Sequence, residues 1–123
     1  MKIVYCVIAS VLACGIASSA RKGSLVQQAP VEYAQLPNAY EGDPLAVRAG
    51  AKLFARECSA CHGADAHGIG KTPPLVIPDV YRAAPGALLW VLTNGSLNRG
   101  MPSYAHLPEP QRWQLVTYLK TLR

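Results

Sequence analysis

The body of this chain contains two cysteines, which stand three residues apart with a histidine directly after the second. The stretch reads "FARECSACHGADAHG", residues 54–68, and places Cys58, Cys61 and His62 in the order C-x-x-C-H. On one turn of helix, side chains three residues apart face the same side. Two thiols and one imidazole are therefore expected close together, and this cluster constrains how the rest of the chain can pack.

Glycine and proline dominate the residues that follow the motif. Residues 63–83 include three glycines and three prolines, which predicts a loop held in shape by proline rather than by strand pairing. Residues 97–106, "LNRGMPSYAH", predict a second loop. Because a small domain buries little apolar surface, loops this long need something internal to pack on.

Three helices are predicted between these loops. The first begins with Asp43 as its N-cap and Pro44 at its first position, delivers the C-x-x-C-H motif at its C-terminal end and stops at Gly63. The second covers about residues 85–94. The third covers residues 108–123 and has one apolar face, flanked by Leu115 and Tyr118 and formed by Trp113, Val116, Leu119 and Leu122. Since no period-2 strand or repeat is present, we expect an all-α fold of three to four short helices and long loops.

The order C-x-x-C-H is the attachment pattern of c-type haem. Each thiol can add to one of the two vinyl groups on one edge of the porphyrin, and His62 then lies under the iron as an imidazole ligand. A covalent haem would also supply the core that the loops lack. We therefore predict one haem c, attached through Cys58 and Cys61.

Three alternatives explain fewer of these features. A structural zinc site usually has four protein ligands, whereas this chain has one C-x-x-C pair. A thioredoxin-like redox site needs its motif near a βαβ unit, and no strand is predicted. A disulfide between Cys58 and Cys61 would leave His62 and the long loops unexplained.

Met101 is the predicted sixth ligand of the iron, since the chain has no other methionine besides that at position 1. Gly100 and Pro102 are expected to fix a tight loop that brings its thioether to the iron. A thioether ligand favours Fe(II) and raises the reduction potential relative to bis-histidine ligation. The alternatives are a gap-filling core methionine, or a distal ligand at His67 or His106, which are more often surface residues.

The N-terminus has the features of an export signal. Lys2 precedes an apolar run of signal-peptide length, so residues 1–20 are predicted to be a signal peptide. "VLAC", which ends at Cys14, resembles a bacterial lipobox in which the cysteine is lipidated, and "SSA", which ends at Ala20, resembles an ordinary cleavage site. A third alternative leaves residues 3–20 uncleaved as an anchor. All three place the domain in the periplasm or on the outer face of the cytoplasmic membrane.

The remainder divides into a linker and one domain. Residues 21–42 are rich in Gln, Ala, Pro and Asn without a sustained period, and predict a linker, a tether or a loosely packed arm that Tyr33 and Tyr40 could pin to the domain. Residues 43–123 are the predicted domain, and a chain of 123 residues is long enough for one domain and not two.

The charge pattern limits the partners. The formal net charge is +5, and the basic residues are scattered. Nucleic-acid binding needs a clustered basic face with aromatic residues, so no nucleic-acid partner is predicted. A weak positive field can still steer an acidic partner.

Over residues 44–123 these motifs resemble class I cytochrome c, the mono-haem His/Met family. Gly50 and Phe54 match its N-terminal helix signature, and Leu115 and Tyr118 match its C-terminal helix signature. The resemblance implies that these two helices cross and that the glycine permits their close approach.

Two loop elements extend the resemblance. "PPL", Pro73 to Leu75, resembles the Pro-x-Leu element, which implies that the carbonyl of Pro73 accepts the N–H of the proximal His62. "GMPSY" resembles the distal methionine loop. The implied iron ligands are His62 and Met101, and the implied haem-binding residues are Cys58, Cys61, His62, Met101, Pro73 and Leu75.

Residues 85–122 look like the small bacterial cytochromes that accompany exported dehydrogenases, often quinoproteins. Some of these stand alone, and others are fused domains or oxidase subunits; the chain lacks the lysine-rich haem rim of the mitochondrial type. The resemblance implies a one-electron carrier, not an enzyme, which passes electrons from a dehydrogenase to an acceptor such as a terminal oxidase. The alternatives are a haem-based sensor or gas-binding module, a cytochrome subunit of a larger oxidoreductase complex, and an enzyme, either peroxidase-like or a thiol-disulfide exchanger.

Overall fold

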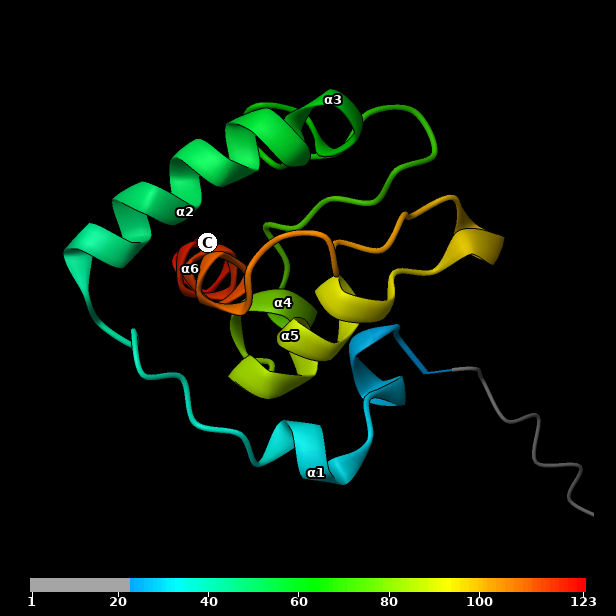
Figure 1. The fold of residues 1–123 in the computed structure, drawn as a ribbon. Helices are drawn as coiled ribbons and strands as arrows, with labels where there is room; N and C mark the ends of the chain where they lie inside the picture. Colours follow the sequence, from blue (N-terminus) through cyan, green and yellow to red (C-terminus); the bar gives the residue numbers. More distant parts are fainter. Residues whose placement is uncertain (1–22) are drawn as a thin grey trace, which may run out of the picture.

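The structure is a computed structural model that describes residues 23–123 (Figure 1). The predicted signal peptide (residues 1–20), its Cys14 lipobox and residues 21–22 of the predicted linker lie outside the described residues. Residues 23–123 form six α-helices and two 3-10 turns, and no strand is found among them. The elements are η1 (Val26–Gln28), α1 (Val31–Ala34), α2 (Pro44–Glu57), α3 (Ser59–His62), α4 (Pro78–Tyr81), α5 (Pro85–Asn94), η2 (Leu97–Arg99) and α6 (Glu109–Leu119).

The all-α prediction is confirmed, and α2, α5 and α6 are the three predicted helices. The Asp43 side chain caps α2 by accepting a hydrogen bond of 2.8 Å from the backbone N–H of Leu45. The helices α1, α3 and α4 have four residues each. Of these, α4 lies in the stretch predicted as loop, where Pro78 stands at its first position and Asp79 in its first turn.

The crossing of α2 and α6 forms the centre of the fold, with α6 seen nearly end-on below α2 in Figure 1. Gly50 lies directly against α6: a methyl group built on it would overlap the carbonyl oxygen of Gln114 and lie 2.7 Å from Cβ of Tyr118. The rings of Phe54 and Tyr118 pack next to this contact, with their centroids 5.4 Å apart and their planes tilted by 53°. Leu115 is fully buried rather than flanking the apolar face as predicted, because α6 is covered on more than one side.

The first predicted helix is interrupted at its end. Instead of running through to His62, α2 ends at Glu57, and Cys58 has φ −120° and ψ −31° before α3 begins. The hydroxyl of Ser59 donates a hydrogen bond of 2.5 Å to the carbonyl of Ala55. Such side-chain back-bonding to the helix carbonyls often bends helices, and here Cys58 lies at the junction of the two helices, whereas Cys61 and His62 lie on α3.

Residues 23–42, which lie in the segment predicted as a linker, a tether or a loosely packed arm, contact the domain at several points. The carbonyl of Tyr33 lies so close to Gly86 of α5 that a side chain there would overlap it. Asn38 is buried and donates a hydrogen bond of 2.9 Å from its amide to the hydroxyl of Thr117 in α6. Tyr40, one of the two tyrosines expected to pin this segment, packs against the hydrophobic core.

Helix α5 supplies most of the remaining core. Six of its ten residues are buried, among them Leu88, Leu89 and Leu92. No helix within residues 23–123 has both the length and the apolar character needed to cross a membrane.

Candidate functional site

His62 ends α3 and makes one well-defined polar contact. Its Nδ1 lies 3.0 Å from the carbonyl oxygen of Pro73. Because a carbonyl can only accept, Nδ1 carries the proton in this contact, and the lone pair of Nε2 is left for a metal. When the nitrogen that does not bind the metal donates such a hydrogen bond, the bond fixes the ring of a metal-binding histidine and raises the basicity of the other nitrogen. The structure therefore contains the contact that the resemblance implied.

The loop after α3 brings the carbonyl of Pro73 to the ring of His62. The backbone N–H of Gly68 donates to the carbonyl of His62 at 2.7 Å, and that of Leu75 donates to the carbonyl of the fully buried Ala66 at 2.8 Å. Gly68 has φ +85°, and a methyl group on it would overlap the carbonyl of Thr72 and lie 3.0 Å from the carbonyl carbon of Pro73. The loop thus closes tightly only because residue 68 has no side chain.

The two cysteines differ in environment. Cys58 is buried and Cys61 exposed, and both are free thiols. Burial, with smaller contributions from Glu57 and Cys61, raises the pKa of Cys58 to about 11. A thiol with so high a pKa forms little thiolate at neutral pH, and the thiolate is the nucleophile in disulfide exchange. This environment disfavours the thiol-disulfide alternative.

Met101 lies in a loop that is fastened to the end of α5. The backbone of Met101 pairs with that of Ser96 in both directions, at 2.8 and 3.0 Å, and Gly100 has φ +80°. The Ser103 hydroxyl donates a hydrogen bond of 2.6 Å to the carbonyl of Thr93. The Met101 side chain is half-buried against the hydrophobic core. In Figure 1, α3 and the loop after it lie above the orange segment that carries Met101.

These side chains fit a haem. A haem needs thiols for its vinyl groups, a neutral imidazole with a free nitrogen, and apolar walls. The thiols are reduced, the tautomer of His62 is the required one, and the partly buried side chains next to the core are mostly apolar: Leu75, Val76, Ile77, Met101 and Tyr104. Leu75 packs against the hydrophobic core and belongs to the same loop as Pro73.

The two histidines considered as rival ligands are both exposed. The side chain of His67 is 67% exposed, and its Nδ1 lies 3.4 Å from Oδ2 of Asp65. The side chain of His106 is 62% exposed, and its Nε2 lies 3.9 Å from Oε2 of Glu57. Both rings face groups near the surface, as expected of surface histidines.

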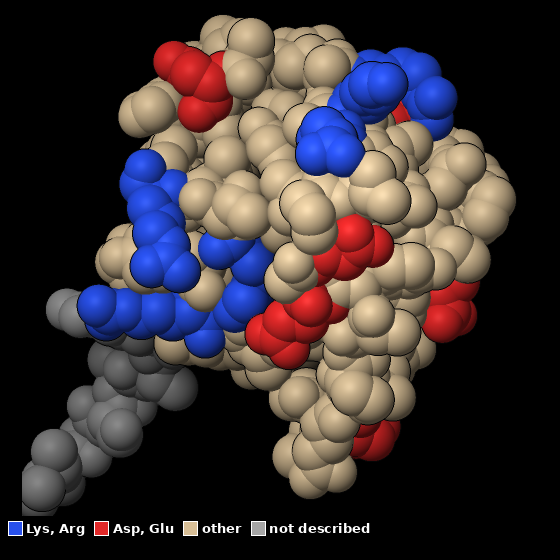
Figure 2. Space-filling view, turned by 90° about the vertical axis from the view of Figure 1, so that its left-hand side faces the viewer, with Lys and Arg blue, Asp and Glu red and all other residues tan. Residues whose placement is uncertain are grey.

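Charges of both signs alternate on the surface. Figure 2 shows the basic residues of one face in separate groups with acidic residues between them. Residues 23–123 carry nine Lys and Arg and seven Asp and Glu, a net charge of +2. This face lacks the continuous basic stripe that nucleic-acid binding needs.

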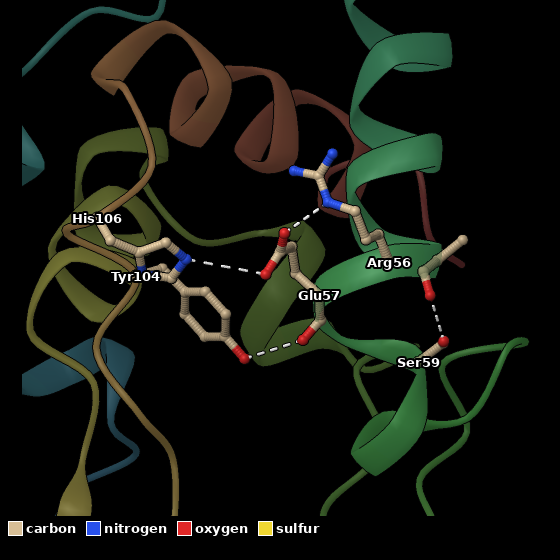
Figure 3. Close-up of polar contacts among 6 residues, drawn as sticks. Arg56, Glu57, Ser59, Tyr104 and His106 are labelled. Carbon is tan, nitrogen blue, oxygen red and sulfur yellow. Dashed lines mark hydrogen bonds and ion pairs between the residues drawn. The ribbon is translucent and has the colours of Figure 1, made fainter.

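One group of polar contacts next to Cys58 has no signal in the sequence (Figure 3). The hydroxyl of Tyr104 donates a hydrogen bond of 3.0 Å to the carbonyl of Glu57, the last residue of α2. The carboxylate of Glu57 accepts from Nε of Arg56 at 2.6 Å. Glu57 and Tyr104 stand 47 positions apart in the sequence, so only the tertiary structure shows that they meet.

Comparison with known proteins identifies the family. Residues 45–119 match the family model described as "Cytochrome C oxidase, cbb3-type, subunit III". The chain is also 34% identical over 91 residues to the quinohemoprotein alcohol dehydrogenase ADH-IIG of Pseudomonas putida. That match covers 72% of this chain and 12% of the relative, so the chain spans about an eighth of the relative's length.

The family match covers more than half of the chain and agrees with the site built from its residues. Domains of this family are electron-transfer modules and not enzymes on their own. The chain therefore belongs to the c-type cytochrome family described by the cbb3-type oxidase subunit III model, and its cofactor is covalently bound haem c.

Proposed function

We propose that this domain is an exported one-electron carrier that takes electrons from a dehydrogenase and passes them to a downstream acceptor such as a terminal oxidase. Haem c supplies the Fe(III)/Fe(II) couple. Cys58 and Cys61 would hold the haem covalently, and His62 and Met101 would ligate its iron. Pro73 orients His62, and Leu75 forms part of the apolar wall.

The contact between His62 Nδ1 and the carbonyl of Pro73 supports this proposal most directly. This contact sets the tautomer of His62 that iron ligation requires. A carrier needs ligands that hardly move between oxidation states, and a ring fixed from behind meets that need. The loop that carries Met101 is held by hydrogen bonds to Ser96 and Thr93, which also supports a sixth ligand that hardly moves between oxidation states.

The identity of the donor rests on the relative. A quinohemoprotein alcohol dehydrogenase contains a segment similar to this chain, which favours a quinoprotein dehydrogenase as donor. The apolar run that follows Lys2 favours export to the periplasm. Lipidation of Cys14 would tether the carrier at the outer face of the cytoplasmic membrane and raise its effective concentration near membrane-bound partners.

Covalent attachment and a closed iron are the first tests. In cells with haem-maturation machinery, the wild type is expected to carry one haem that survives denaturing electrophoresis, and the Cys58→Ala/Cys61→Ala variant none. Carbon monoxide is expected to leave the spectrum of the reduced wild type unchanged, because both axial positions are filled. Strong carbon monoxide binding by the wild type would contradict the carrier and favour the sensor.

Gly68→Ala is expected to raise the reduction potential. The added methyl group would push the Pro73 carbonyl away from His62, making the imidazole less basic and Fe(III) less stable. If this hydrogen bond stabilises Fe(III) over Fe(II) by roughly 1 kcal/mol, its loss corresponds to a rise of roughly 40 mV for a one-electron couple. Protein-film voltammetry measures the change.

Gly70→Ala is the matched control for this prediction. Gly70 also has a positive φ, +58°, but nothing lies within 4 Å of a methyl group built there. It should carry similar backbone strain without changing the potential. Equal reduction potentials in Gly68→Ala and Gly70→Ala would show that the hydrogen bond from His62 to Pro73 does not influence the iron.

A further inference from the structure

The loop that carries Met101 is joined to two helices. On one side its backbone is fastened to the end of α5, where the N–H of Tyr104 donates to the carbonyl of Leu92 at 2.8 Å. On the other side the Tyr104 hydroxyl reaches the carbonyl of Glu57, next to Cys58 (Figure 3). Tyr104 therefore connects the proposed distal loop to the helix that precedes the haem attachment motif.

The hydrogen bond from the Tyr104 hydroxyl to the Glu57 carbonyl is suited to hold the Met101 loop in place, and we call it the Tyr104 lock. Carbonyls in the last turn of a helix have no partner within the helix, and the hydroxyl satisfies that of Glu57. The side chain is half-buried, and burial raises the pKa of Tyr104. The phenol therefore stays protonated and donates at neutral pH. The contact of His106 with Glu57, at 3.9 Å and largely exposed, is weaker.

We propose that Tyr104 is a positioning residue that holds the Met101 loop against the end of α2 and so keeps the sixth coordination position of the iron closed to external ligands. The inference rests on the proposed ligation by His62 and Met101. An external ligand can bind only after Met101 has left the iron and the loop has moved. Because the Tyr104 hydrogen bond exists in the closed state, its loss makes opening easier and raises the apparent affinity for external ligands.

The test is a titration of the oxidised haem protein with imidazole, followed by absorbance. Tyr104→Phe keeps the ring and removes the hydroxyl, and it is expected to bind imidazole about five- to tenfold more tightly than the wild type, as expected from the loss of one hydrogen bond. Without imidazole, the far-red sulfur-to-iron band should remain in the variant. An unchanged affinity would overturn the proposal.

Two control variants distinguish the loss of the Tyr104 hydrogen bond from a general loss of stability of the protein. Tyr118→Phe removes the hydroxyl of another half-buried tyrosine, whose ring packs on Phe54 in the helix crossing. His106→Gln removes the weaker contact with Glu57. Both should bind imidazole within about twofold of the wild type, and an equal gain in Tyr118→Phe would overturn the proposal.

A measurement on the wild type covers the case in which Tyr104→Phe does not retain haem. Hydrogen exchange of the oxidised protein should show faster exchange at the amides of Met101 and Tyr104 when imidazole is bound, because the loop then leaves its closed position. Unchanged exchange at both amides would overturn the lock. A wild type without the far-red band would instead refute the Met101 ligation itself, so the two failures are distinguishable.

Discussion

Met101→Ala is expected to abolish the far-red sulfur-to-iron charge-transfer band of the oxidised protein and to convert its low-spin spectrum to a high-spin one. The loss follows because the thioether is the proposed sixth ligand and alanine cannot replace it. Imidazole should bind to the variant about a hundredfold more tightly, if the open state of the wild type is populated to about 1%. The reduction potential should fall, since methionine favours Fe(II).

His106→Ala and His67→Ala are the controls, because these are the other histidines of the chain besides His62. Both are exposed, and both variants should keep the band and the potential of the wild type. If Met101→Ala remained low-spin and one histidine variant became high-spin, that histidine would be the distal ligand. The electron carrier would then have a lower potential, as bis-histidine ligation implies.

Much of the site could be predicted because its residues lie close together in the sequence. Cys58, Cys61 and His62 are within one turn of helix, and Pro73 follows His62 by eleven residues across a single loop. The glycine and proline content of that loop indicated its shape. The hydrogen bond of Tyr104 to Glu57 could not be predicted in this way, because a tyrosine hydroxyl can pair with any carbonyl that the tertiary structure brings near.

The packing of the N-terminal segment likewise depends on tertiary contacts that the sequence pattern does not predict. Its composition favours a linker, a tether or a loosely packed arm, and residues 23–42 pack on α5 and α6 through two features: the bare surface of Gly86 and the side-chain amide of Asn38. Neither produces a periodic apolar pattern, on which sequence-based assignment depends. The break between α2 and α3 was likewise missed, since it comes from one hydroxyl, that of Ser59, bonding to a helix carbonyl.

Gly50→Ala is expected to destabilise the folded haem protein by roughly 2–3 kcal/mol, as overpacking in a close contact does. Helix propensity alone predicts the opposite sign, because alanine in place of glycine within a helix stabilises it by about 1 kcal/mol. The added methyl group would overlap the carbonyl of Gln114 and approach Cβ of Tyr118 to 2.7 Å. Both neighbours belong to the backbone or to the first side-chain carbon of α6, so neither can move without shifting that helix. Guanidinium unfolding followed by haem absorbance and helical circular dichroism measures the change.

The exposed Ala55 provides the matched control on the same helix. Ala55→Gly should lose about 1 kcal/mol, which would show that the propensity scale holds in α2. A stabilised Gly50→Ala beside a destabilised Ala55→Gly would mean that propensity dominates at both positions and that the crossing of α2 and α6 tolerates a wider separation. Destabilisation of both variants would instead show that the requirement for glycine at residue 50 comes from α6, and that the contact between the two helices, formed by residues far apart in the sequence, determines the fold around the haem.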